Sequence, residues 1–257
     1  MKYFIHIPKS AGTSLRAAMV ASGAGNVRLK PIYDRADHEQ LLQRPPRLPC
    51  DALLFGHFSF GLHRVIADDS PEYTTVLRNP VERVISLYHH HHRFPSSPYH
   101  SLLNERRYTL SDFVLSGLTP ETNNEVVRNL SASYGRIPLL CDRLANTWWR
   151  ATRGVGTRQI DERFRLRRAL GNVERFFVHV GCIPKLQETV CFLEEWTGLP
   201  PGTLKPPREN VFLGEREEVG PSTLQVLENA NELDLELYEM TLSGRLPRKK
   251  PQRTSLP

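Results

Sequence analysis

The 257-residue sequence contains no apolar run near the roughly 18 residues that a membrane-spanning helix requires. Only four cysteines are present and none forms a CxxC pair, so the spacing of a structural zinc site is missing and we expect free thiols. The apolar stretch at residues 4–7 is too short for the core of a signal peptide. The sequence therefore predicts a cytoplasmic protein without a transmembrane segment.

Lysine and arginine outnumber aspartate and glutamate by 34 to 28, which gives a formal net charge of +6. Such an excess suits an anionic partner: a nucleic acid, an acidic polymer or a polyphosphate cofactor. The sequence lacks the aromatic pair of an RNA-recognition motif, a zinc finger and a basic zipper, so we expect no nucleic-acid partner. The sequence leaves the oligomeric state open.

Short apolar runs alternate with helical patterns along the chain, and the runs lead into loops or helices. Such alternation predicts an α/β fold with a central, mostly parallel sheet that helices cover on both faces. In sheets of this kind, ligands bind beyond the carboxyl ends of the strands. Strands are predicted at residues 3–7, 52–55, 73–77 and 176–180.

The chain shows no internal repeat and no linker between domains, so we expect a single domain over residues 1–245. Residues 95–171 are predicted to form a mainly helical insertion, interrupted at Pro120 and Pro138. The basic, proline-rich residues 246–257 are predicted to form a disordered tail.

The string FIHIPKSAGTSLR is typical of an anion-binding loop between a strand and a helix. The backbone N–H groups at the start of such a helix point outward and attract negative charge, and small residues at positions 10–12 let an oxyanion approach the backbone. Hydroxyls and one lysine add donors. The GxxxxGK[ST] spacing of ATP- and GTP-binding loops is absent. The loop comprises Lys9, Ser10, Ala11, Gly12, Thr13, Ser14 and Leu15.

A second strand-to-helix junction follows in VLRNPVERVISLYHHH. Asn79 is a good N-cap, Pro80 suits the first helical position, and Glu82 completes a capping-box-like start. Arg78 stands at the strand end, where we expect its guanidinium to be free for bidentate phosphate binding. Ser86 lies about two turns into the helix and off the apolar face.

The two strings resemble the cofactor-binding signatures of the P-loop sulfotransferases, above all the branch with the heparan sulfate 2-O-sulfotransferases and related carbohydrate enzymes. The resemblance covers the first third of the chain, and ERFFVHVGCIPKLQETVCFLEE is similar to a later segment of the same family. It implies a P-loop NTPase-like, three-layer α/β/α fold. It also implies 3′-phosphoadenosine 5′-phosphosulfate (PAPS) as the sulfonate donor, 3′-phosphoadenosine 5′-phosphate (PAP) as the product, and no metal.

The same resemblance assigns residues to the donor. Positions 9–15 would hold its 5′ side, and Arg78 with Ser86 its 3′-phosphate. Lys205 and Arg208, in a late basic loop, would close over the nucleotide.

Histidine titrates near neutrality and can remove a proton from an acceptor hydroxyl. His57 follows a predicted strand, and the family uses a histidine in a similar Gly-His segment as its base, so we favour His57. His63 is the alternative base or a substrate contact, and a glutamate elsewhere is a further alternative. The run at positions 89–92 is predicted to be a solvated helix end, because consecutive helical residues point in different directions.

The segment TPETNNEVVRNLSA resembles an acceptor-binding region, which makes Asn123, Asn124 and Arg128 candidate substrate contacts. The acceptor is expected to be a carbohydrate, with a lipid, a polyketide or a small alcohol left open. Residues 150–168 are rich in arginine and favour an acidic acceptor.

Two other hypotheses remain. A nucleotide-dependent kinase would need a Walker lysine and a magnesium-binding aspartate after a strand, whereas Asp51 precedes its strand. A non-catalytic protein could bind anionic polymers through residues 150–168. That hypothesis leaves both anion loops unexplained.

Overall fold

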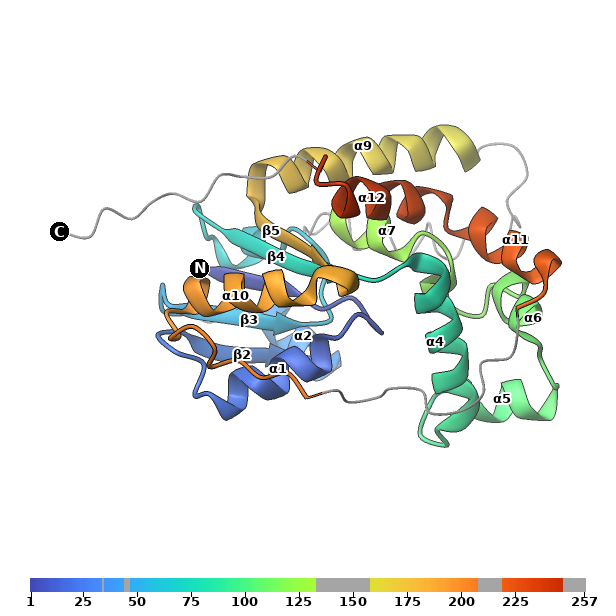
Figure 1. The fold of residues 1–257 in the computed structure, drawn as a ribbon, viewed down its shortest axis with the longest axis horizontal. Coiled ribbons are helices and arrows are strands. Elements are labelled where there is room, and N and C mark those ends of the chain that lie inside the picture. The colour runs from blue at the N-terminus through green and yellow to red at the C-terminus, as the bar shows by residue number, and fades with distance from the viewer. Residues whose placement is uncertain (34, 44–46, 133–157, 208–218, 247–257) are drawn as a thin grey trace.

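The computed structural model describes residues 1–33, 35–43, 47–132, 158–207 and 219–246 (Figure 1). Its centre is a five-stranded sheet with the order β2-β3-β1-β4-β5, in which every neighbouring pair is parallel. The predicted α/β class and parallel sheet are confirmed. The strands are β1 (Lys2–Ile5), β2 (Arg28–Ile32), β3 (Ala52–Gly56), β4 (Glu72–Leu77) and β5 (Phe177–Cys182).

The middle strand β1 is buried on both faces because helices cover both sides of the sheet. Successive side chains of a strand point to opposite faces, so Tyr3 and Ile5 join one core cluster and Phe4 joins the other. Phe4 stacks on Phe55 of β3 with the ring centroids 4.1 Å apart. This alternation fixes the register and holds the carboxyl ends of β3, β1 and β4 side by side.

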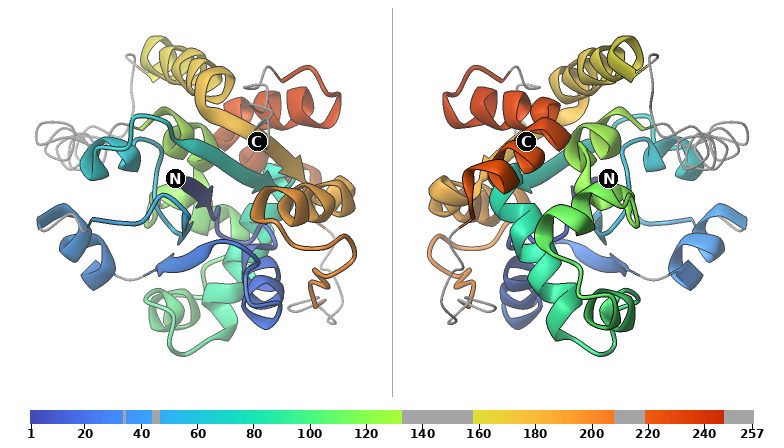
Figure 2. Two further views of the ribbon diagram at one scale, coloured as in Figure 1. Left: turned by 90° about the vertical axis from the view of Figure 1, so that its left-hand side faces the viewer. Right: turned by 90° about the vertical axis from the view of Figure 1, so that its right-hand side faces the viewer.

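Helices lie on both faces of the sheet and make three layers (Figures 1 and 2). Leu15 and Met19 on one helix and Val190 and Leu193 on another cover the face that carries Phe4. Leucines and valines of five further helices cover the opposite face. The first pair is α1 (Gly12–Ala21) and α10 (Leu186–Thr197); the others are α2 (Arg35–Gln43), α3 (Leu62–Ile66), α7 (Glu125–Ser131), α9 (Arg158–Phe176) and α12 (Glu232–Leu242).

A second group of helices packs beside the carboxyl end of β4 (Figure 1). Small apolar clusters hold it together, one around Val84, Val114 and Leu227 and one around Leu87 and Phe113. The group contains α4 (Pro80–Arg93), α5 (His100–Glu105), α6 (Leu110–Leu115) and α11 (Pro221–Ala230). The described part of residues 95–171 is mainly helical as predicted, with a 3₁₀ turn at η1 (Pro120–Thr122); Pro138 lies outside the described residues.

Helices α7 and α12 cap each other. The Asn124 side-chain oxygen accepts from the N–H groups of Leu233 and Asp234, at 3.0 and 3.2 Å. The Asp234 carboxylate in turn accepts from the N–H groups of Val126 and Val127, at 2.9 and 2.8 Å. Each side chain satisfies N–H groups that the first turn of the other helix leaves open. The candidate substrate contact Asn124 is thus buried, engaged in capping α12 and outside the cavity lining.

The edge strand β2 was not predicted. Its sequence, RLKPI, contains two basic residues and a proline, and such residues are typical of loops. Pro31 is tolerated because an edge strand leaves one row of N–H groups outside the ladder. The strand matters for the site because Tyr33 directly follows its last residue, Ile32.

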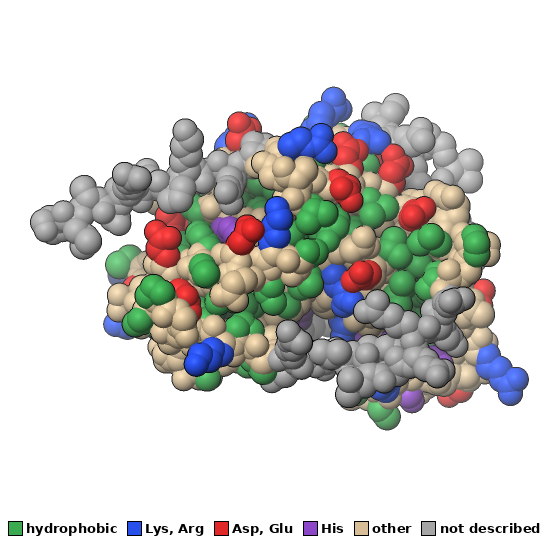
Figure 3. Space-filling view, in the orientation of Figure 1, with side chains coloured by type: hydrophobic (Ala, Val, Ile, Leu, Met, Phe, Trp, Pro, Cys, Tyr) green, Lys and Arg blue, Asp and Glu red, His purple; other side chains and the backbone are tan. Residues whose placement is uncertain are grey.

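The arginine-rich stretch lies partly outside the described residues, and its described part belongs to α9. Basic and acidic side chains are mixed over this helix (Figure 3). Arg163 pairs with Glu236 and, at 2.7 Å, with Glu232 of α12. The charge of the stretch is thus partly neutralised within the molecule. Within the described residues, the helices are too short or too polar to cross a membrane. The predicted tail lies almost entirely in residues 247–257, which are not described.

Candidate functional site

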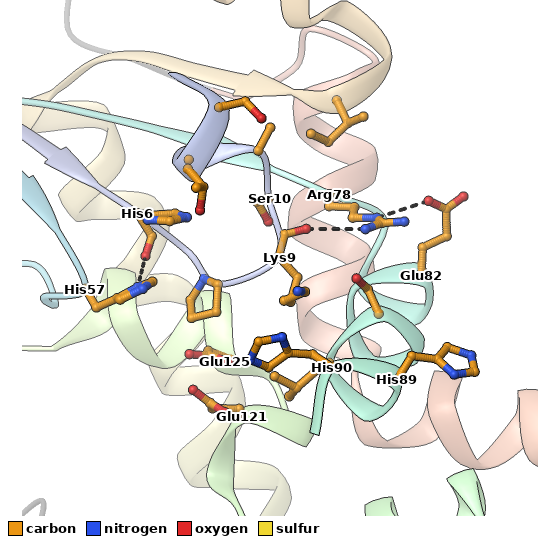
Figure 4. Close-up of a pocket in the computed structure, with 18 of the residues that line it drawn as sticks. His6, Lys9, Ser10, His57, Arg78, Glu82, His89, His90, Glu121 and Glu125 are labelled. Carbon is orange, nitrogen blue, oxygen red and sulfur yellow. Dashed lines mark hydrogen bonds and ion pairs between the residues drawn. The ribbon is translucent and has the colours of Figure 1, made fainter. Parts of the chain in front are cut away.

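A cavity of about 1150 Å³ opens beyond the carboxyl ends of β3, β1 and β4 (Figure 4). The chain leaves β1 toward β2 and leaves β4 toward β5, so the connections diverge at this point. Parallel sheets bind ligands where their connections diverge in this way. The loop after β1, His57 after β3, Arg78 after β4 and the inner side of α4 all line the cavity.

The loop after β1 turns sharply before α1 begins. Lys9 and Ala11 adopt left-handed backbone conformations, with φ of 67° and 61°. The turn brings the first, unpaired N–H groups of α1 to the wall of the cavity, where they can donate to an anion. The Ser10 hydroxyl is buried in this wall and has no hydrogen-bond partner among the described residues. A buried hydroxyl of this kind is suited to a ligand oxygen.

The close approach of the His6 ring requires glycine at position 12. A Cβ atom at this position would lie 2.0 Å from a carbon of the His6 imidazole, well inside van der Waals contact. The His6 ring therefore lies directly on the backbone of the loop. The backbone angle of Gly12 is not left-handed, so sterics rather than backbone freedom select glycine.

His57 presents one ring nitrogen to the cavity. Its Nδ1 lies 2.9 Å from the His6 carbonyl oxygen, which can only accept, so Nδ1 carries the proton and Nε2 is the basic nitrogen. Burial lowers the pKa of His57, and the hydrogen bond to His6 and the charge of Glu121 offset only part of that effect. The ring is therefore neutral at pH 7 and available to accept a proton.

The two expected donor-binding residues from the second junction do line the same cavity. Asn79 caps α4 as predicted, accepting from the N–H groups of Val81 and Glu82. The expectation of a free Arg78 is wrong: its Nε donates to Glu82 at 3.2 Å, and its Nη1 donates to the Lys9 carbonyl at 3.4 Å. Glu82 lies four residues after Arg78, in the first turn of α4, within reach of its guanidinium. Ser86 lines the cavity one turn further on.

Lys9 extends from the loop toward His90 and toward Glu121 and Glu125 in the cavity wall (Figure 4). Burial and the neighbouring charge of Arg78 lower the pKa of Lys9. Burial and the charge of Lys9 likewise lower the pKa of His90. The ammonium group thus points into the cavity from the side of the anion loop.

Two glutamates that were not predicted, Glu121 and Glu125, line the wall opposite the loop. Arg83 is fully buried behind them and donates to the Glu125 carboxylate at 2.9 Å and to the Glu121 carbonyl at 2.6 Å. Burial raises the pKa of Glu125. Burial also acts to raise the pKa of Glu121, but His91, Arg83 and His57 outweigh it and the net pKa is lowered. An arginine within a helical pattern usually points to solvent, so the sequence carried no signal for this buried pair.

The remaining histidine predictions need correction. His63 is buried away from the cavity lining, with its Nδ1 2.9 Å from the Tyr73 hydroxyl, and burial lowers its pKa to about 4. It therefore occupies a place in the core and not that of a base. In the histidine run, His89, His90 and His91 line the cavity, and His91 is also buried against Ser97 and Tyr99. The run is only partly a solvated helix end because one of its faces closes the cavity.

Other candidate residues lie at or beside the cavity in different ways. Leu15 is fully buried beneath the loop and packs on the sheet. Asn123 accepts a hydrogen bond from Asn124 at 3.4 Å, and burial lowers the pKa of Arg128, which lies outside the cavity lining. Lys205 is exposed, although Pro206 and Pro207 reach the cavity; Arg208 lies outside the described residues.

Comparison of the sequence with models of known protein families and with curated proteins gave no match. The function is therefore inferred from the cavity. Its chemistry comprises an anion loop, a second cationic anchor and a neutral histidine that share one space.

Proposed function

We propose that the protein is a PAPS-dependent sulfotransferase that acts on a hydroxyl group, in the first instance of a carbohydrate. One observation carries the proposal: the anion loop, the Arg78–Ser86 pair and Nε2 of His57 face a single cavity of about 1150 Å³. That volume accommodates a nucleotide together with part of an acceptor.

The residues present fit a donor with phosphates at both its 5′ and 3′ ends. The Ser10 hydroxyl is a buried polar group without a partner, and the loop backbone is open to an oxyanion at the start of α1. Arg78 and Ser86 offer a second anion site on the neighbouring strand end and helix. PAPS, when bound, supplies the sulfonate group and is released as PAP.

The chain's own residues supply acid–base and electrostatic assistance. Nε2 of His57 accepts the proton of the acceptor hydroxyl, because Nδ1 already donates to the His6 carbonyl. The imidazolium that results is stabilised by the carboxylate of Glu121 across the cavity. Lys9 and the N–H groups of the loop stabilise the negative charge that develops at the donor side.

The proposal is tested by transfer of labelled sulfate from PAPS to a panel of neutral and acidic glycans, lipids and small alcohols. We expect transfer by the wild type and losses of about 10²-fold or more in Lys9→Ala and His57→Gln. His92→Gln is the matched control for His57→Gln, since His92 is an exposed histidine that lies outside the cavity lining. Undiminished transfer by His57→Gln would contradict the assigned base, and phosphoryl transfer from ATP in place of sulfate transfer would contradict the proposal.

A further inference from the structure

Two aromatic rings and one hydrogen bond fix the ring of His57. The His6 imidazole stacks on it, with centroids 4.4 Å apart and an interplanar angle of 25°. The Tyr33 ring meets it edge to face at 4.8 Å and 89°. Together with the bond from Nδ1 to the His6 carbonyl, these contacts restrict both the tilt and the rotation of the imidazole.

The two supporting rings are themselves held in place. The Tyr33 hydroxyl lies 3.0 Å from Nδ1 of His6. The Tyr33 N–H donates to the Asp37 carboxylate at 3.0 Å, and the Arg16 guanidinium lies over the Tyr33 ring at 5.0 Å. Residues from the loop after β1, from α1 and from α2 thus converge on a tyrosine that directly follows β2, the edge strand on the side of the sheet away from β4.

His6 also joins the base to the anion loop. Its ring occupies the space that a side chain at Gly12 would fill, and it stacks on His57. Burial, and after it the charges of His57, Arg16 and Lys9, lower the pKa of His6 to about 3. The His6 ring therefore stays unprotonated near neutral pH.

We propose that His6 and Tyr33 are positioning residues that hold His57 in its Nδ1–H tautomer, with Nε2 directed into the cavity. The inference rests on the proposed function of His57 as a base, which it deepens. Neither residue touches the reacting atoms; each acts through the orientation and the tautomer of the neighbouring imidazole.

The tautomer of His57 is measured by long-range ¹H–¹⁵N NMR on the full-length, uniformly ¹⁵N-labelled protein without donor or acceptor. The His57 signals are assigned by their absence in His57→Gln. We expect a single neutral tautomer in the wild type, protonated at Nδ1. A predominant Nε2–H tautomer would overturn the proposal.

Tyr33→Phe keeps the edge-to-face ring and removes only the hydroxyl that holds His6. The hydroxyl anchors His6, whose main-chain carbonyl accepts from Nδ1 of His57, so its loss should loosen that acceptor. We therefore expect the Nε2–H tautomer of His57 to become populated beside the Nδ1–H form and kcat to fall roughly three- to tenfold. The affinity for PAP should change by less than about twofold, since the anion loop is untouched. His6→Leu removes the stacked ring as well, so we expect it to change the tautomer population of His57 and kcat more than Tyr33→Phe does.

Tyr73→Phe is the matched control. It removes the hydroxyl that lies 2.9 Å from Nδ1 of His63 and accepts from the His63 N–H at 3.1 Å, away from the cavity. We expect it to lower stability without changing the tautomer of His57. An unchanged tautomer in both Tyr33→Phe and His6→Leu overturns the proposal even where sulfate transfer is found. Because the tautomer is recorded without any substrate, the absence of transfer counts against the proposed function alone.

Discussion

Gly12→Ala is the sharpest test of the packing between the anion loop and the base. The added Cβ would lie 2.0 to 2.4 Å from three atoms of the His6 ring, so the ring must move until ordinary contact of 3.4–4 Å is restored. Overpacking of this kind costs about 1–3 kcal/mol. Displacement of the ring also breaks its hydrogen bond to Tyr33, which adds about 1 kcal/mol. The better helix propensity of alanine returns at most about 1 kcal/mol.

The net expectation is a loss of about 1–3 kcal/mol in the free energy of unfolding, measured by urea denaturation. The same substitution in a His6→Ala background meets no ring and should be neutral or slightly stabilising, because Gly12 does not have a left-handed backbone. The double-mutant cycle should therefore give a coupling of about 2 kcal/mol. If Gly12→Ala lowered the free energy of unfolding equally in both backgrounds, the contact between Gly12 and the His6 ring would be refuted.

Four further outcomes are expected. His57→Gln should abolish most sulfate transfer, by about 10²-fold or more, while calorimetry finds the affinity for PAP within about twofold of the wild type. Arg78→Ala should weaken PAP binding by about tenfold or more and leave the binding of adenosine 5′-phosphosulfate, which has no 3′-phosphate, unchanged. Asn124→Ala should cost about 1–3 kcal/mol in urea denaturation, since it removes the cap of α12 and places alanine at a φ of 42°, with no change in PAP affinity. The pKa of His6 is about 3 in the fold and 6.5 in the unfolded chain, so its contribution to stability is full above pH 6.5 and is lost as the pH falls toward 3. His6→Asn should remove up to about 1.4 kcal/mol per pH unit from the slope of stability in that window; an unaltered slope would contradict a neutral His6.

The sequence predicts the parts of the fold whose periodicity is strong. The four predicted strands correspond to β1, β3, β4 and β5 within a few residues, because each is a compact apolar run before a loop. Asn79 and Pro80 likewise predict the start of α4. The strand at residues 28–32 was missed because its charges and its proline are allowed only by its place at the edge of the sheet.

The candidate site was predicted where its residues follow strands, and missed where it depends on tertiary packing. The loop at positions 9–14, His57, Arg78 and Ser86 share the cavity. The support of His57 comes from Tyr33, which directly follows an unpredicted strand. Glu125 reaches the cavity because a buried arginine of another helix compensates it, and no local sequence pattern marks such a pair.

In the proposed function, the loop after β1 and the Arg78–Ser86 pair together hold a nucleotide with 5′- and 3′-phosphates. Calorimetric titration with PAP and with Mg·ATP tests it most directly. We predict that PAP binds more tightly than ATP and that Arg78→Ala removes this preference. Tighter binding of ATP, or a preference for PAP that survives in Arg78→Ala, would contradict a site for two phosphates at these residues.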